Sequence, residues 1–286
     1  MKRTTLTIIA VFVALFAVIT IMKNKPSEQQ GDSAENSVTN AEKEKVIKFW
    51  ENYRQATDFR LEGQWEEAAA MYRAALSLNG EHEDALYYLG NMYFDLSKFR
   101  EAEECWQKLL QVNPKNSRAF RQLGILYLSS DELFDIGKAE NACREALRLN
   151  REETGPLLSL GEVELIKGQL AEAAADFKAV TGSNFKSIEA YFLGGYIAWK
   201  KHDKQNARRL YSLAVKYSKP SDNPGKVLGE GDTKPGHSFG NVTSQSIFKE
   251  YIVELREVEQ AQIDASLEKA YRKLDGTLAE LKSKVL

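Results

Sequence analysis

Residues 83–116 read EDALYYLGNMYFDLSKFREAEECWQKLLQVNPKN, and this stretch decides the fold of the chain. It contains two sets of apolar or small residues, each spaced by four and then three positions, which places each set on one face of a helix. Ser97 lies between the sets, where we expect a turn. The stretch therefore predicts two short antiparallel helices. The two sets are Leu86, Gly90 and Tyr93, then Ala102, Trp106 and Leu109.

The same pattern returns about every 34 residues. The third copy carries about three extra residues at 131–137, and the fourth has Glu164 where an apolar residue is expected. One helix pair cannot bury its apolar face alone, so the pairs are expected to stack. In each copy a small residue of the first helix faces an alanine of the second, which lets the two helices approach closely. The five copies are residues 49–82, 83–116, 117–153, 154–187 and 188–219.

A fixed period of this length with these residue types resembles the tetratricopeptide repeat family over residues 49–219. The resemblance implies an all-α fold, an α-solenoid of about five helix-turn-helix repeats. It also implies that the first helices line a concave, partner-binding groove. Mapped onto this chain, the groove residues are Tyr53, Arg54, Tyr87, Tyr88, Asn91, Phe94, Arg118, Arg121, Tyr196 and Trp199. A subgroup of the family grips a C-terminal carboxylate, but only Arg118 fits its pattern, so that mode is disfavoured.

The chain begins with an apolar run, residues 6–22, which is at the short limit for crossing a bilayer. No small-x-small cleavage site ends the run, so we expect an uncleaved transmembrane signal anchor behind a cytoplasmic N-terminus, residues 1–5. Residues 23–48 are mostly polar and are predicted to form a flexible linker. The nearest charges favour an inner-membrane, single-pass protein with its repeats outside the cytoplasm, in the periplasm of a bacterium. The alternative is an anchor with the repeats facing the cytosol.

After the repeats the composition changes. Residues 220–246 form a Gly/Pro-rich loop, and residues 247–286 regain helical periodicity and are predicted to form a C-terminal helix. Its apolar residues from Leu267 to Val285 follow a heptad spacing. We expect this helix to cap the open end of the solenoid. The second interpretation is a partner-binding or self-association helix through residues 247–286, and the helix could also fold into the groove itself.

No residue pattern points to catalysis. The histidines are isolated, so no metal site follows, and neither a phosphate-binding loop nor a nucleophile elbow is present. Cys105 and Cys143 are interpreted as packing residues. The net charge is −2, whereas nucleic-acid-binding proteins are usually basic. We therefore expect no enzyme activity, no cofactor and no nucleic-acid partner.

These features together predict a membrane-anchored scaffold or assembly factor that binds other proteins or peptides in the groove of its repeats. The alternatives are a cytosol-facing anchored receptor for targeting sequences and an accessory subunit of an enzyme complex.

An uncleaved anchor has a direct consequence. The mature protein should keep Met1 and should leave the membrane only in detergent, because an apolar span of this length partitions into lipid. N-terminal sequencing of the purified protein checks this, and a sequence that begins beyond residue 22 would show that the run is a cleaved signal peptide.

Overall fold

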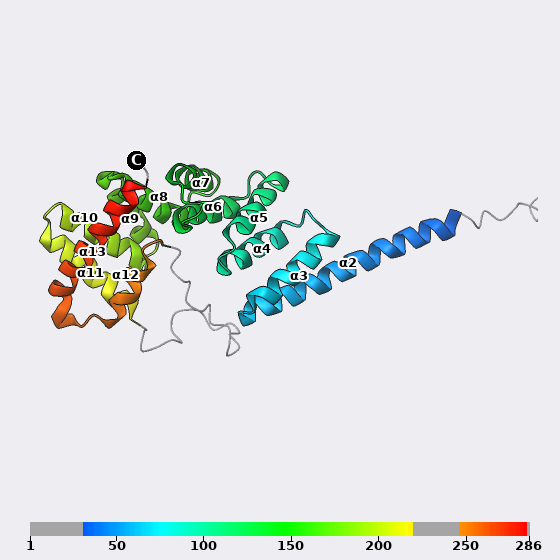
Figure 1. Ribbon diagram of the computed structural model, residues 1–286, viewed down its shortest axis with the longest axis horizontal. Coiled ribbons are helices and arrows are strands. Elements are labelled where there is room, and N and C mark those ends of the chain that lie inside the picture. Colours follow the sequence, from blue (N-terminus) through cyan, green and yellow to red (C-terminus); the bar gives the residue numbers. More distant parts are fainter. Residues whose placement is uncertain (1–30, 220–245, 285–286) are drawn as a thin grey trace, which may run out of the picture. The chain divides into compact units, whose positions relative to one another are not determined.

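The computed structural model describes residues 31–219 and 246–284, with side chains from Thr39 onward. The chain divides into two units, residues 1–50 and residues 51–286. Within the described ranges the regular structure is helical throughout, with twelve α-helices and two short 3-10 helices (Figure 1). The predicted all-α fold is therefore confirmed.

The first unit contributes the beginning of α2 (Gly31–Glu62), which continues into the second unit. The prediction of a flexible linker at residues 23–48 is therefore wrong from Gly31 onward. The reason lies in the composition, because no glycine or proline follows until Gly63, and alanine, glutamate and lysine are good helix formers. The predicted anchor at residues 6–22 lies outside the described residues. In the described part of the chain, no helix is both long and apolar enough to cross a membrane.

Five helix pairs follow one another in the predicted register. Contacts between neighbouring helices run from α3 through α11 without a gap, as stacked pairs require. The pairs are α2 with α3 (Trp65–Leu78), α4 (Glu83–Asp95) with α5 (Phe99–Val112), α6 (Ser117–Ser129) with α7 (Ile136–Leu149), α8 (Thr154–Lys167) with α9 (Leu170–Ser183), and α10 (Ile188–Lys200) with α11 (Lys204–Ser218).

The turns within the pairs are tight. Four of them contain one residue with positive φ, namely Gly63, Ser97, Gly168 and His202, and Ser97 lies where the sequence predicts a turn. A left-handed residue ends a helix because it redirects the chain within one peptide. The third pair instead has a longer loop, and the side chain of Asp135 caps α7 by accepting a hydrogen bond from the N–H of Lys138.

The two helices of a pair approach most closely at a glycine. A methyl group on Gly124 would lie 2.7 Å from the sulfur of Cys143, and one on Gly161 would lie 2.6 Å from the ring of Phe177. Gly90 faces the ring of Trp106 in the same way, and that indole donates a hydrogen bond to the Tyr87 carbonyl at 3.3 Å. In the second and fourth pairs the bulky side chain of the second helix, Trp106 or Phe177, therefore fills the space that the glycine leaves open.

The C-terminal segment, residues 246–284, is not the single helix that was predicted for residues 247–286. It comprises α12 (Lys249–Glu254), two 3-10 turns (Leu255–Glu257 and Gln260–Gln262) and α13 (Ile263–Ser283). The backbone is extended at Val258, between the two 3-10 turns. The helix α13 packs against α8 and α11, and its side chains also form hydrogen bonds with α10 (Figure 1). The predicted heptad face is buried against the chain's own repeats from Leu267 to Leu278.

Two glycines of the repeats should respond oppositely to alanine. Gly90→Ala should destabilise the array by about 1–3 kcal/mol, because the new methyl overlaps the ring of Trp106. Gly182→Ala should stabilise it by about 0.5–1 kcal/mol, because no atom lies within 4 Å of the new methyl and alanine favours the helix. Urea denaturation of both variants measures the difference. Equal effects would contradict the close approach at Gly90.

Candidate partner-binding groove

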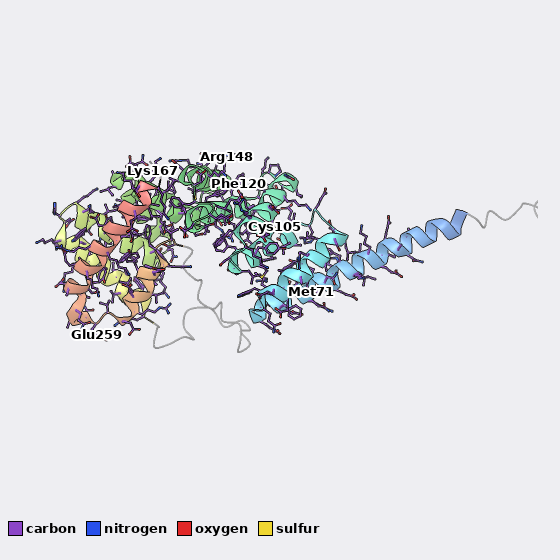
Figure 2. The ribbon with its side chains drawn as sticks, in the orientation of Figure 1. Met71, Cys105, Phe120, Arg148, Lys167 and Glu259 are labelled. Atoms are coloured by element: carbon purple, nitrogen blue, oxygen red, sulfur yellow. The ribbon has the colours of Figure 1, made fainter. Side chains whose placement is uncertain are left out.

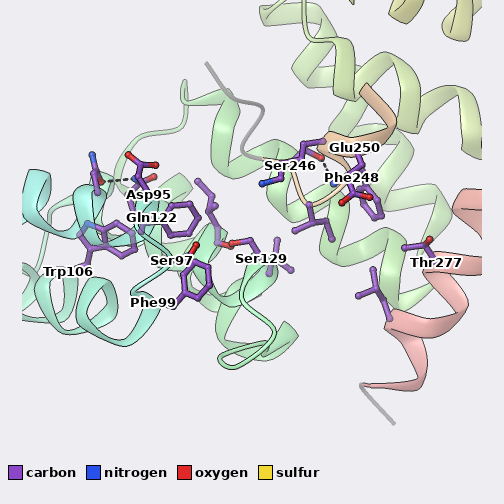
Figure 3. Close-up of a pocket in the computed structure, with 17 residues that line it drawn as sticks. Asp95, Ser97, Phe99, Trp106, Gln122, Ser129, Ser246, Phe248, Glu250 and Thr277 are labelled. Atoms are coloured by element: carbon purple, nitrogen blue, oxygen red, sulfur yellow. Dashed lines mark hydrogen bonds between the residues drawn. The ribbon is translucent and has the colours of Figure 1, made fainter. Parts of the chain in front are cut away.

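A cavity of about 700 Å³ lies on the groove side of the second and third helix pairs. Figure 3 shows one wall formed by side chains of α4, α5 and α6 and the facing wall formed by the C-terminal segment. Sequence reasoning placed Asn91 and Phe94 here, and both line the cavity. It did not identify the facing wall, which consists of Ser246 to Glu250, Thr277 and Leu281.

The floor of the cavity carries an amide pair. Gln122 donates a hydrogen bond to the Oδ1 atom of Asn91 at 2.8 Å (Figure 3). The other end of the Gln122 amide, Oε1, is buried and has no hydrogen-bond partner. A buried carbonyl without a donor costs free energy, so this amide pair is a polar group that the surrounding packing leaves incompletely satisfied.

Apolar side chains surround this amide pair. Phe94 packs edge-on against Phe99, with ring centroids 5.6 Å apart. Ile125 and Leu128 line the cavity from α6, and Ile247 lines it from the opposite wall. A ligand of the cavity therefore needs apolar side chains.

Tyrosine and arginine side chains of the first two pairs contact one another in a row. The ring of Tyr53 contacts the ring of Tyr72 at 5.6 Å, and Tyr72 stacks on Tyr88 at 5.9 Å. The guanidinium of Arg60 lies over the Tyr88 ring at 4.4 Å. Burial raises the pKa of Tyr53 to about 12, so its hydroxyl stays protonated and can donate. Arg54 of the same helix is exposed.

The arginines of α6 differ in how firmly they are held. Arg118 lies over the Tyr87 ring and pairs with Asp84 at 2.6 Å, and the two side chains are 40% and 47% exposed. Arg121 donates to the hydroxyl of Tyr87 and pairs with Glu153, with side chains only 24% and 18% exposed. An exposed ion pair stabilises a folded protein by about 0–1 kcal/mol. Arg118 is therefore available to a ligand, whereas Arg121 is mainly structural.

The two predicted groove residues of the fifth pair are covered by α13. Tyr196 donates to Asp275 at 2.6 Å, and the Trp199 indole donates to Glu268 at 2.9 Å. A hydrogen bond from Lys200 is the main cause that lowers the pKa of Asp275. The structure therefore separates Tyr196 and Trp199 from the other eight predicted residues, because a segment remote in sequence occupies their part of the groove.

The side chain of Tyr271 holds α13 against the fifth pair. Its hydroxyl donates to the Phe192 carbonyl at 3.1 Å and lies over Gly195, where any methyl group would overlap it. This arrangement repeats the one in which Trp106 lies over Gly90. Tyr271 is fully buried, so the C-terminal segment is packed into the fifth pair as tightly as a second helix is packed into its own pair.

A buried carboxyl holds the other end of the C-terminal segment. Glu162 of α8 is completely buried and accepts a hydrogen bond from Ser246. Burial raises the pKa of Glu162 to about 8, which the hydrogen bonds from Ser246 and from the backbone of Ile247 only partly offset. The carboxyl is therefore neutral near pH 7 and anchors one end of the cavity wall.

Neither thiol has the properties of a nucleophile. Burial raises the pKa of Cys105 and of Cys143 to about 12, which keeps both protonated. Both cysteines are free thiols, and Cys105 is labelled in Figure 2.

Within residues 31–219 and 246–284, no group of three His, Cys, Asp or Glu side chains is placed to hold a metal ion.

Family models of the tetratricopeptide repeat match residues 53–98 and residues 83–116. The matches support the family that the residue pattern indicated, which is generally a scaffold family and not an enzymatic one. Among curated proteins, BBSome complex member BBS4 of Bos taurus is 31% identical over 126 residues, or 44% of this chain and 24% of that protein. Anaphase-promoting complex subunit 3 of Schizosaccharomyces pombe is 21% identical over 151 residues, or 53% of this chain and 22% of that protein. The chain thus spans about a quarter of the length of such relatives.

Solved structures agree on the fold. MamA from Desulfovibrio magneticus superposes with a TM-score of 0.53 at 15% identity, over 59% of this chain and 94% of that one. The structure of pilF from Pseudomonas aeruginosa gives a TM-score of 0.56 at 17% identity, over 82% of this chain and 99% of that one. At such identities the likeness shows a shared helical-repeat fold.

The buried Glu162 predicts how stability depends on pH. The folded-state pKa of about 8 lies above the ordinary value of 4.5, so the unfolded chain loses this proton first and stability falls as pH rises from about 5 to 8. The substitution Glu162→Gln should remove the part of the stability loss that this carboxyl causes, which is on the order of a few kcal/mol. Urea denaturation at a series of pH values measures it.

The control is Glu104→Gln, which changes an exposed side chain of α5 and should follow the pH dependence of the parent chain. If the stability of the Glu162→Gln variant falls with pH in parallel with that of the parent, the role assigned to Glu162 is refuted.

Proposed function

We propose that this chain is a protein–protein interaction scaffold and that the open groove of its first three helix pairs binds a segment of a partner protein. The observation that carries the proposal is the cavity, which combines apolar walls with polar lining side chains such as Asn91, Asp95 and Glu250. A peptide supplies both apolar side chains and N–H donors. Eight of the ten groove residues predicted from the sequence lie on these three pairs.

The partner does not bind the part of the groove that lies beyond the cavity. In the fourth and fifth pairs the groove side is covered by the C-terminal segment, whose side chains Phe248, Ile263 and Tyr271 are fully buried. Each such burial contributes about 1.5–3 kcal/mol, so a partner would have to replace a large interaction to displace the segment. The C-terminal segment therefore acts as a cover for the last two pairs and as a fixed wall of the binding site.

We further propose that the chain is held at a membrane. The support is the apolar run at residues 6–22 and the absence of a cleavage site after it. Charges next to the run favour repeats on the extracytoplasmic side of the inner membrane. The relatives named as complex members and subunits support, for this chain, a place in a larger assembly.

Blocking the cavity tests the proposed site. A random linear library of twelve-residue peptides, displayed on phage, serves as the probe for the immobilised full-length chain. Ser129 is exposed and lines the cavity (Figure 3), so Ser129→Trp should fill the cavity without disturbing the core. Selected peptides should bind this variant about tenfold more weakly or worse, the range of an interface hot spot.

The matched control is Gln111→Trp, which adds the same indole to an exposed position on α5 and should leave binding unchanged. Peptides that bind the Ser129→Trp variant as well as the parent would place the functional surface elsewhere. Failure of the library to yield any binder to the parent would count against a peptide-binding groove.

A further inference from the structure

The chain already contains one segment bound in its groove, and that segment shows what the groove recognises. The helix α13 is amphipathic, and its apolar stripe is buried against the repeats. Carboxylates border the same stripe at Asp264, Glu268 and Asp275, of which Asp264 is exposed, as are Lys269 and Arg272. The side chains with which α13 contacts the repeats in this stretch are therefore apolar residues and carboxylates.

Each of these carboxylates meets a donor of the repeats. Glu268 accepts a hydrogen bond from Trp199, and Asp275 accepts one from Tyr196 at 2.6 Å and pairs with Lys200 at 2.7 Å. Arg208 of α11 pairs with Asp264 at 2.8 Å. Aromatic donors and cations on the repeats thus hold three carboxylates of α13, which lie beside the apolar stripe of a helix whose acidic and basic residues are equal in number.

The open part of the groove offers donors of the same kind. Arg60 occupies the position in its repeat that Trp199 occupies in the fifth, and its guanidinium is held over the Tyr88 ring. Arg118 is likewise held over an aromatic ring, that of Tyr87, and only the half-exposed Asp84 balances it. Preorganised guanidinium groups bind carboxylates well because they form paired, charge-assisted hydrogen bonds.

Charge changes along the open groove. The first pair carries Arg54 and Arg60, and Arg118 of the third pair lies beside Asp84 of the second. The cavity, further along, is lined by apolar side chains together with Asp95, Lys249 and Glu250, and so carries no excess of positive charge. A ligand that satisfies both regions has carboxylates toward the first pair and apolar side chains toward the cavity.

We propose that the open groove takes an acidic amphipathic helix of a partner protein, whose carboxylates meet Arg60 and Arg118 while its apolar side chains enter the cavity. This inference rests on the proposed function, and it adds the chemical class of the partner. The partner helix lies in the groove as an equivalent of α13, with apolar anchors at helical spacing.

A helix library built on α13 tests the proposal. Displayed peptides keep the apolar residues of Ile263–Ser283, and the positions of Asp264, Glu268 and Asp275 vary among Asp, Asn and Lys. Selection uses the immobilised full-length chain. Acidic members should be enriched about tenfold over lysine members, the factor that one charge-assisted hydrogen bond supplies.

Variants of the chain locate the bound peptide. Acidic peptides should bind the double variant Arg60→Gln/Arg118→Gln about tenfold more weakly, because the carboxylates lose their donors. The control Arg148→Gln, which removes an exposed cation of α7 outside the groove, should leave binding unchanged. The substitution Ser129→Trp should also abolish binding, which excludes a peptide that merely replaces α13 on the fifth pair.

The outcomes separate this inference from the proposed function. Equal enrichment of Asn or Lys members overturns the acidic partner, and so does binding that is insensitive to Arg60→Gln/Arg118→Gln or to Ser129→Trp. If only linear peptides from the random library bind, and lose binding in Ser129→Trp, the groove function stands and the acidic helix does not. If neither library gives a binder that depends on Ser129, both proposals fail.

Discussion

The close approach of the two helices within each pair is the constraint on which the rest of the structure depends. In the second to fourth pairs it requires a residue without a β-carbon, such as Gly90 opposite Trp106, whereas the first pair has the fully buried Ala56 at this position. Glycine in a helix costs about 1 kcal/mol relative to alanine. That cost is offset by the burial of the large side chain, which fits only in the space that the glycine leaves open. Once this contact is set, the register of each pair and the direction of its groove side chains are set with it.

The same rule explains why the C-terminal segment is part of the array. The fifth pair has its glycine, Gly195, but the side chain over that glycine belongs to Tyr271 and not to the second helix of the pair. The glycine thus accepts an aromatic residue that is distant in sequence. The consequence for function is that α13 closes the groove over the fourth and fifth pairs and leaves a cavity over the second and third.

Two buried carboxyl groups lower the stability of the fold. Glu162 is buried with hydrogen bonds but no cation among the groups that shift its pKa. Glu164 occupies a position where the repeats otherwise carry an apolar side chain, and burial raises its pKa to about 7. An apolar residue is less costly at either position. At Glu162 the carboxyl anchors the wall of the cavity, whereas nothing in the structure explains Glu164.

The sequence alone determined the helices of the repeats and their turns, because these follow from contacts within about 34 residues. Ser97 lies at a turn as predicted, and Asn91 and Phe94, which were predicted as groove residues, line the cavity. The sequence did not place the C-terminal segment, because the contacts of Tyr271 and Asp275 join residues 79 positions apart and no local pattern records them. Only the tertiary structure decided which part of the groove is filled and which is open, since an apolar stripe is equally compatible with a cap, a partner helix and a groove ligand until its packing is known.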